Sequence, residues 1–237
     1  MNGDLIVDAG EFNNVDISYP AGIMQNFDSY AEGWEAFAQF LAVRSDKYYR
    51  LEDEYHPLYY RMARFVPGIN PKVGTLNRSG QFAVTFDCKP QKYLLSGESE
   101  IVIADYSDAV GVTDAIGVTF TNPTEYVAYP EIQLTPGVDV ELQSDAYHSI
   151  LLFTPSNPTE YAAHPGKVVY YAKISEAIWT YTSHGHETVE YVTDQVELSG
   201  DPVKVAPGTN SLSVLRASGE SDRSDINIRL KPRWYTI

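Results

Sequence analysis

Residues 48 to 65, YYRLEDEYHPLYYRMARF, bring together acids, arginines, tyrosines and a histidine, which are residue types that can take part in catalysis or binding. Glu52, Asp53 and Glu54 could supply the paired carboxylates of a glycosidase, with the neighbouring tyrosines stacking on sugar rings. Consecutive residues of a β-strand, however, point to opposite faces of the sheet, so adjacent acids do not converge on one substrate. The spacing therefore argues against an acid–base pair in this segment.

Three arginines of the same segment, Arg50, Arg61 and Arg64, offer partners to these acids across the strands of a hairpin. Such partners would keep a carboxylate ionised, whereas a general acid needs a raised pKa. Pro57 has no N–H and biases His56 away from helical geometry, so residues 54–57 are predicted to connect strands over 48–53 and 58–66. We expect an aromatic, charged hairpin that packs within the protein or forms an interface.

A second group of chemically capable residues is His184, His186 and Glu187, which flank Gly185. Two histidines at i and i+2 share one face of a strand and could bind a divalent ion together. Zinc sites, however, use three or four ligands, and neither a cysteine nor an H-E-x-x-H pattern supports this pair. An exposed glycine-containing loop is the alternative that we prefer, and we expect no bound metal.

The single cysteine, Cys88, belongs to a clear strand pattern over residues 81–89, in which Phe82, Val84, Phe86 and Cys88 share one face. A buried cysteine behaves as a small apolar residue with a raised pKa, so Cys88 is not expected to act as a nucleophile. Pro90 is expected to end this strand. The sequence contains no G-x-S-x-G, Walker A or G-x-G-x-x-G motif. We therefore predict no catalytic, metal-binding or cofactor-binding residues, and no enzyme.

One amphipathic helix is expected over about residues 28–44. Its start is marked by Asp28 and by a capping box of Ser29 and Glu32. Its apolar residues recur at helical spacing, and they are Tyr30, Trp34, Phe37, Leu41 and the adjacent Phe40. Residues 5–20 contain two short β-prone runs around a polar turn.

From about residue 98 the pattern changes to short strands separated by glycine and proline, as in an all-β sandwich. The expected strands cover residues 99–104, 116–121, 131–134, 138–142, 149–154, 167–173, 188–192, 195–198, 211–215 and 225–231. We therefore predict a β-sandwich-like N-terminal domain with one helix over residues 1–103 and a C-terminal β-sandwich over 104–237. Within the latter, residues 122–130 (NPTEYVAYP) are nearly repeated at 157–165 (NPTEYAAHP). We interpret both copies as turns at strand ends, with a local duplication that shares a binding role as the alternative.

Composition restricts the possible functions further. The 237 residues carry a formal net charge of −15, which opposes binding to the phosphates of DNA or RNA. One cysteine allows no intrachain disulfide bond. No apolar run approaches the length of a membrane span, so no membrane partner is expected. No basic and apolar leader follows Met1, so we expect synthesis and assembly in a cytoplasm.

Several ordered blocks of the sequence resemble the distal tail protein family of long-tailed bacteriophages and prophages. The matching blocks are NGDLIVDAGEFNNVDISYP (2–20), YYRLEDEYHPLYYRMARF (48–65), GQFAVTFDCKPQKYLLSGE (80–98), VTFTNPTEYVAYPEIQL (118–134), PGTNSLSV (207–214) and INIRLKPRW (226–234). The FDCKPQKYL and LEDEYHP…RMARF pieces are the most specific of these. The second NPTEY copy departs from the family pattern.

This resemblance implies a structural component of the virion tail tip, made in the host bacterial cytoplasm. The N-terminal domain would form a homo-hexameric ring around a channel through which the genome passes without sequence-specific binding. The C-terminal domain would be a galectin-like or carbohydrate-module-like sandwich. The implied partners are the tail tube protein, a tail-associated lysin or tail fibre, and receptor-binding proteins.

Two other functions remain open from the sequence. A carbohydrate-binding module would use the tyrosine-rich segment, Trp179, Tyr181 and the two NPTEY copies for stacking on host cell-surface glycans. A glycan-cleaving enzyme would require a convergent pair of carboxylates, which the sequence does not show.

Overall fold

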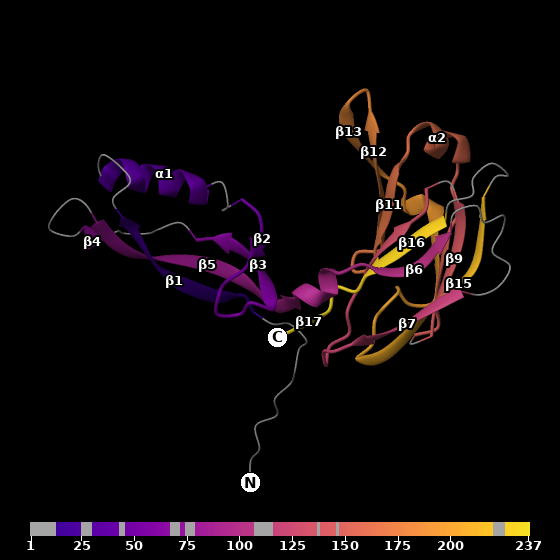
Figure 1. Cartoon of the computed structure of the whole chain (residues 1–237), viewed down its shortest axis with the longest axis horizontal. Helices are drawn as coiled ribbons and strands as arrows, with labels where there is room; N and C mark the ends of the chain where they lie inside the picture. Colours follow the sequence, from indigo (N-terminus) through magenta and orange to yellow (C-terminus); the bar gives the residue numbers. More distant parts are fainter. Residues whose placement is uncertain are drawn as a thin grey trace, which may run out of the picture. The chain divides into compact units, whose positions relative to one another are not determined.

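The computed structural model describes residues 13–24, 30–42, 46–66, 72–73, 79–106, 116–136, 138–145, 147–219 and 226–237. Contacts between residues divide the chain into two compact units, Met1–Lys92 with Ile237, and Tyr93–Thr236 (Figure 1). The predicted boundary at residues 103 and 104 falls inside a strand, Ile101–Tyr106, whereas the chain divides between Lys92 and Tyr93. The N-terminal residues 5–12 of the predicted β-prone stretch lie outside the described residues.

The first unit is an antiparallel sheet covered on one face by a helix. Its elements are β1 (Val15–Met24), α1 (Tyr30–Ala42), β2 (Tyr49–Leu51), β3 (Tyr59–Phe65), β4 (Lys72–Val73) and β5 (Ser79–Leu94). The strand order is β1-β5-β3-β2, with β4 paired to β5. The hairpin predicted over residues 48–66 is confirmed, because β2 and β3 pair antiparallel with Leu51 opposite Arg61.

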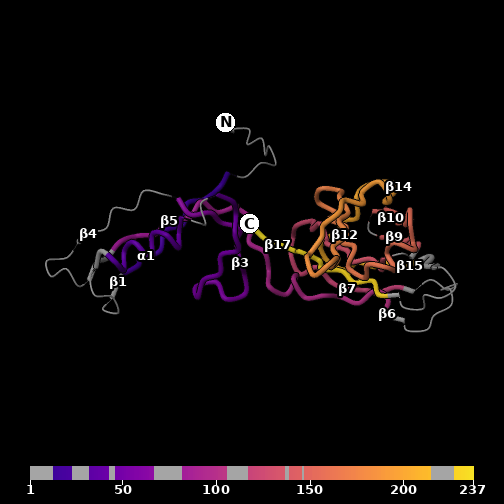
Figure 2. Tube along the Cα trace, turned by 90° about the horizontal axis from the view of Figure 1, so that it is seen from above, coloured from indigo at the N-terminus to yellow at the C-terminus, as the bar shows by residue number. Residues whose placement is uncertain are grey.

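Helix α1 lies over the β1 and β5 part of this sheet in both views (Figures 1 and 2). Trp34, Phe37 and Leu41 pack against Phe82 and Val84 of β5, which confirms the predicted apolar faces of both elements. The helix spans Tyr30–Ala42, within the predicted range of about 28–44. The predicted capping residues Asp28 and Ser29 lie outside the described residues. Phe40, expected on the apolar side, is 54% exposed, which corrects its place in the pattern.

Strand β5 continues through Pro90 to Leu94, so the prediction that Pro90 ends this strand is wrong. The pairing of β1 with β5 runs from Ser79 to Cys88 only. Pro90 therefore lies beyond the segment of β5 that β1 covers. The N–H that Pro90 lacks is therefore not needed for the pairing of β5 with β1.

The second unit is a sandwich of two antiparallel sheets. The elements that open it are η1 (Leu95–Glu98), β6 (Ile101–Tyr106), β7 (Ile116–Asn122), β8 (Glu131–Leu134), β9 (Val138–Ser144), β10 (Ser149–Phe153), α2 (Pro158–Ala163) and β11 (Gly166–Tyr171). The remaining elements are β12 (Glu176–Ser183), β13 (His186–Tyr191), η2 (Thr193–Gln195), β14 (Val196–Ser199), β15 (Gly208–Gly219) and β16 (Ile226–Lys231). The last strand, β17 (Tyr235–Thr236), pairs with β5 and belongs to neither sheet of the sandwich. One sheet has the order β14-β10-β9-β15-β7 and the other β13-β12-β11-β8-β16-β6.

The core between these two sheets is built by alternating residues of facing strands. Ile132 and Leu134 of β8 pack in one cluster with Val140 and Leu142 of β9, and all four side chains are fully or almost fully buried. Each strand predicted between residues 99 and 231 overlaps an observed strand. The mainly β architecture with a C-terminal sandwich is thus confirmed. Neither described helix is long and apolar enough to cross a membrane.

Strand β12 is absent from the predicted set. It forms a hairpin with β13, and the two histidines lie in the turn and at the start of β13. Ser183 pairs with His186, and the two residues between them, His184 and Gly185, both have positive φ. That is the geometry of a two-residue hairpin turn, which follows the right-handed twist of the strands. Among the described residues, no group of three or more potential ligands is arranged to hold a metal ion.

The two NPTEY copies have different structures. The first, beginning at Asn122 where β7 ends, is a turn as predicted. The second forms α2, with Asn157 as the N-cap residue and Pro158 at the first helical position. The prediction that both copies are turns is therefore wrong for 157–165. Asparagine followed by proline is a good helix start as well as a good turn, so the shared NPTEY residues permit both structures.

Gly166, the first residue of β11, is expected to tolerate no side chain. A Cβ here would meet the carbonyl oxygen of Thr180 and lie 2.8 Å from Cβ of Tyr181, so β11 and β12 would have to separate. We expect Gly166→Ala to lower the free energy of unfolding by about 1–3 kcal/mol, as measured by urea denaturation. Gly185→Asn is the control, because that site has open space and asparagine accepts positive φ. Equal stability of the two variants would contradict the expected clash.

Candidate functional site

The β2–β3 connection is organised around the carboxylate of Asp53. One of its oxygens accepts a hydrogen bond of 2.6 Å from the Tyr19 hydroxyl of β1. The other accepts from the backbone N–H of His56 at 2.8 Å and lies 3.1 Å from Nδ1 of the same histidine. Asp53 therefore fixes the loop to the sheet and closes the turn from its own position to His56.

These contacts make Asp53 unsuitable as a general acid. The Tyr19 hydroxyl, followed by the contacts with His56, holds the pKa of Asp53 below its usual range although burial acts in the opposite direction. Burial and the bond to Asp53 in turn raise the pKa of Tyr19. The void that Tyr19, Asp53, His56 and Arg61 line has a volume of about 10 Å³, enough for one water molecule. No substrate fits in a space of that size.

Two of the three arginines bind groups other than the acids of their own segment. Arg50 pairs with Glu52 at 2.6 Å, which is a pair within one side of the hairpin and not the predicted pair across its strands. Arg61 instead donates to the carbonyl oxygens of Lys89 and Pro90 at 3.3 and 2.9 Å. Arg64 forms an ion pair of 2.8 Å with Asp87 of β5. Arg61 thus stabilises β5 beyond the segment paired with β1, so a change at Arg61 would disturb the first unit itself and not only an interface.

Two surfaces of the first unit remain exposed around these anchors. The first, here called the tip, consists of Glu54, Tyr55 and Leu58 in the β2–β3 connection. Tyr55 is 78% and Leu58 is 68% exposed, although both are large and apolar. Exposed apolar residues held on an anchored loop are typical of interaction sites.

The second surface, here called the cation face, consists of Tyr48, Arg64 and Lys89 on the side of the sheet opposite α1. Lys89 Nζ lies 4.4 Å and the Arg64 guanidinium 5.4 Å from the centre of the Tyr48 ring. The Tyr48 hydroxyl donates to Asp87 at 3.0 Å and so fixes the ring. Arg64 lowers the pKa of Asp87, with Tyr48 and Asn14 contributing, in opposition to the effect of burial. Spacing in the sequence does not indicate this cluster, since Lys89 comes from β5 and the other two residues from the hairpin over 48–65.

Cys88 is fully buried, as predicted, and burial raises the pKa of its thiol to about 11. A thiolate nucleophile is therefore not available at neutral pH. Trp179 and Tyr181, predicted as candidates for stacking on sugars, form an internal stack instead. Their ring centres lie 4.0 Å apart, Trp179 is only 2% exposed, and its ring also contacts Tyr161 at 4.3 Å. Trp179 is thus a core residue, which corrects that prediction.

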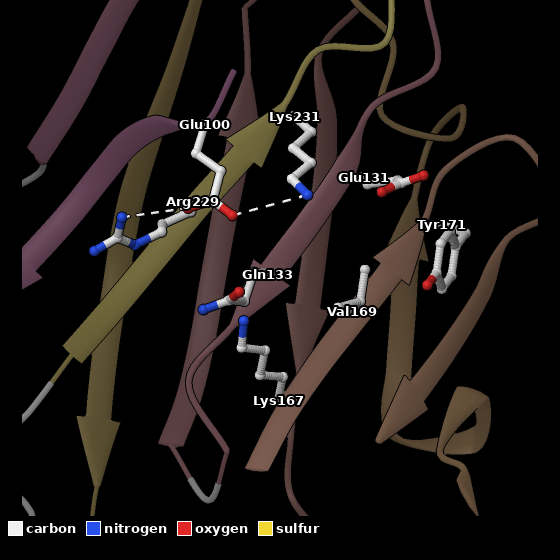
Figure 3. Close-up of a pocket in the computed structure, with 8 residues that line it drawn as sticks. All are labelled: Glu100, Glu131, Gln133, Lys167, Val169, Tyr171, Arg229 and Lys231. Carbon is white, nitrogen blue, oxygen red and sulfur yellow. Dashed lines mark hydrogen bonds and ion pairs between the residues drawn. The ribbon is translucent and has the colours of Figure 1, made fainter. Parts of the chain in front are cut away.

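A shallow pocket of about 190 Å³ lies on the solvent face of the six-stranded sheet in the second unit (Figure 3). Both of its carboxylates are already paired, because Glu100 contacts Arg229 at 3.3 Å and Lys231 at 3.9 Å, and Glu131 contacts Arg233 at 2.9 Å. Its volume is below the roughly 300–1,000 Å³ of most small-molecule sites. The pocket is best described as a salt-bridged sheet surface.

Loss of the Asp53 carboxylate should destabilise the first unit in a pH-dependent way. The pKa of Asp53 is lower in the folded than in the unfolded state, so its stabilisation is present above about pH 4 and is lost as the pH falls through the folded pKa. We expect Asp53→Ala to lower the free energy of unfolding by about 1–3 kcal/mol at pH 7 in urea denaturation, with the difference shrinking toward pH 3. Glu54→Gln should have no such effect. A difference that is constant with pH would contradict this role.

Comparison with solved structures places the whole chain in a known fold. The chain is similar to the SPP1 Dit protein, described as a paradigm of the hub adsorption apparatus of phages that infect Gram-positive bacteria, with a TM-score of 0.55 and 11% identity over 96% of this chain and 81% of that one. It is also similar to a chain of the phage p2 baseplate in its activated conformation with Sr, with a TM-score of 0.50 and 9% identity over 91% and 78%. No protein-family model matches the sequence, and the curated proteins give no significant match. The fold expected from the sequence resemblance is therefore the fold observed.

Proposed function

We propose that this chain is a structural component of a bacteriophage or prophage tail tip, forming a ring-shaped hub between the tail tube and the adsorption apparatus. The observation that carries the proposal is the similarity to the SPP1 Dit hub protein, which covers 96% of this chain and therefore includes both units. The sequence blocks at 48–65 and 80–98 resemble the same family independently of the fold.

The proposed assembly is a homo-hexameric ring made by the first unit, located at the distal end of the virion tail and assembled in the host cytoplasm. The second unit would attach the adsorption parts, namely a tail-associated lysin or fibre and receptor-binding proteins, and the tail tube protein would bind the ring. A net charge of −15 supports a channel through which DNA passes without binding, because like charges repel. The role is non-enzymatic. Two observations fit this role: Glu131 is held in an ion pair with Arg233, and the void beside Asp53 has room for one water molecule only.

Immunogold electron microscopy of phage particles tests the location directly. Antibodies raised against the purified chain are expected to label the distal end of the tail. Antibodies against the isolated major capsid protein of the same particles serve as the control for head labelling. Particles that carry no label, or label only on the head, would refute the proposed function.

A further inference from the structure

The tip of the first unit presents a charged side chain and two large exposed side chains to solvent. Glu54 is exposed and forms no ion pair with any residue that the structure describes. It adjoins Tyr55 and stands four residues before Leu58, both of them mostly exposed. Asp53 fixes the loop through Tyr19 and His56, so the tip is held in one shape before any partner binds. A preformed surface of this kind loses little entropy on docking.

The cation face of the same unit has the opposite character. The ammonium group of Lys89 lies over the Tyr48 ring and, within the described parts of the chain, pairs with no carboxylate. Arg64 beside it keeps 49% of its side chain exposed while paired with Asp87. An aromatic ring flanked by cations can receive both a carboxylate and an apolar side chain. α1 covers the other face of this sheet, so the helix does not occupy the cation face.

We propose that the tip of one copy docks on the cation face of a second copy, with Glu54 pairing with Lys89 and Tyr55 and Leu58 packing beside Tyr48. This inference rests on the proposed function and names the contact that would build the ring. The two surfaces differ and lie on one unit, so the contact is heterologous. Repeated heterologous contacts build a ring when the rotation from one copy to the next closes. Charge complementarity favours a second copy as the occupant of each surface.

Charge reversal at the two ends of this contact tests the inference. Sedimentation velocity of the full-length chain is expected to show assembly for the wild type. Glu54→Lys and Lys89→Glu should each weaken association by at least about 100-fold, because each places like charges together. An equimolar mixture of the two variants should assemble again, since every contact then joins unlike charges. The double variant should assemble alone for the same reason.

The control is Glu197→Lys, which makes the same change of charge at an exposed position of β14 in the second unit. It should assemble like the wild type. Restored assembly in the mixture also shows that both single variants are folded.

If the wild type assembles and Glu54→Lys assembles equally well, the docking contact is overturned while the hub function stands. A monomeric wild type, or single variants that fail to assemble and are not rescued by mixing, would also overturn the contact; the immunogold result then decides the function separately. If Lys89→Glu instead abolishes binding of duplex DNA without changing assembly, the cation face serves a nucleic acid and the proposal is wrong.

Discussion

Trp179→Ala is expected to lower the free energy of unfolding of the second unit by about 3–5 kcal/mol. The side chain is 2% exposed and lies between the rings of Tyr161 and Tyr181 in the core of the sandwich. Its removal leaves a cavity that the rigid strands on both sides cannot close. It also takes away two aromatic contacts that stabilise beyond the buried area. Urea denaturation followed by far-ultraviolet circular dichroism measures the effect.

Tyr191→Ala is the matched control, because Tyr191 is an aromatic residue of the adjacent strand β13 but is 70% exposed. It should change the free energy of unfolding by no more than about 0.5 kcal/mol. A small effect at Trp179 would mean that its ring is not part of the core. Trp179 would then be a surface residue again available for stacking on a glycan, as the sequence alone allowed.

Trp179 also shows where sequence patterns reach their limit. Alternation identifies which residues of a strand share a face, and it correctly grouped Phe82, Val84 and Cys88 in β5. It does not say which face another layer covers. Ala177, Trp179 and Tyr181 alternate equally well, yet only the second sheet and α2 decide that their side is inside. Most strands of the second unit could thus be predicted, although β12 itself was missed, and the burial of its Trp179 could not be predicted.

The candidate site has the same limit for a different reason. The segment from 48 to 65 was recognisable as a charged hairpin because its two strands are close in sequence. Its anchors are not close: Tyr19 reaches Asp53 across 34 residues, and Arg61 reaches Pro90 across 29. Such contacts depend on the register of β1 and β5, which short-range spacing does not define. The sequence therefore predicted the type of surface but not the partners that fix it.

The two NPTEY copies show how tertiary contacts select between local structures. In the first copy Asn122 is 2% exposed, accepts from the backbone N–H and hydroxyl of Thr124 at 3.0 and 2.8 Å, and donates to the carbonyl oxygen of Tyr126 at 2.9 Å. In the second copy Asn157 is exposed and caps α2 by accepting from the N–H of Glu160 at 3.3 Å. Pairing of β7 with β15 at Asn122 holds the first copy in the extended turn, whereas burial of Tyr161 against the core holds the second as a helix.

The same substitution at the two asparagines should consequently have unequal effects. Asn122→Ala is expected to lower the free energy of unfolding by about 2–4 kcal/mol, because it removes the bonds of a buried side chain to the N–H and hydroxyl of Thr124 and to the carbonyl oxygen of Tyr126. Asn157→Ala removes one exposed helix cap and should cost about 1 kcal/mol, which Asn157→Ser should restore. Urea denaturation of the three variants measures the difference. Equal losses at the two positions would show that the repeated residues, and not their surroundings, determine how each copy is stabilised.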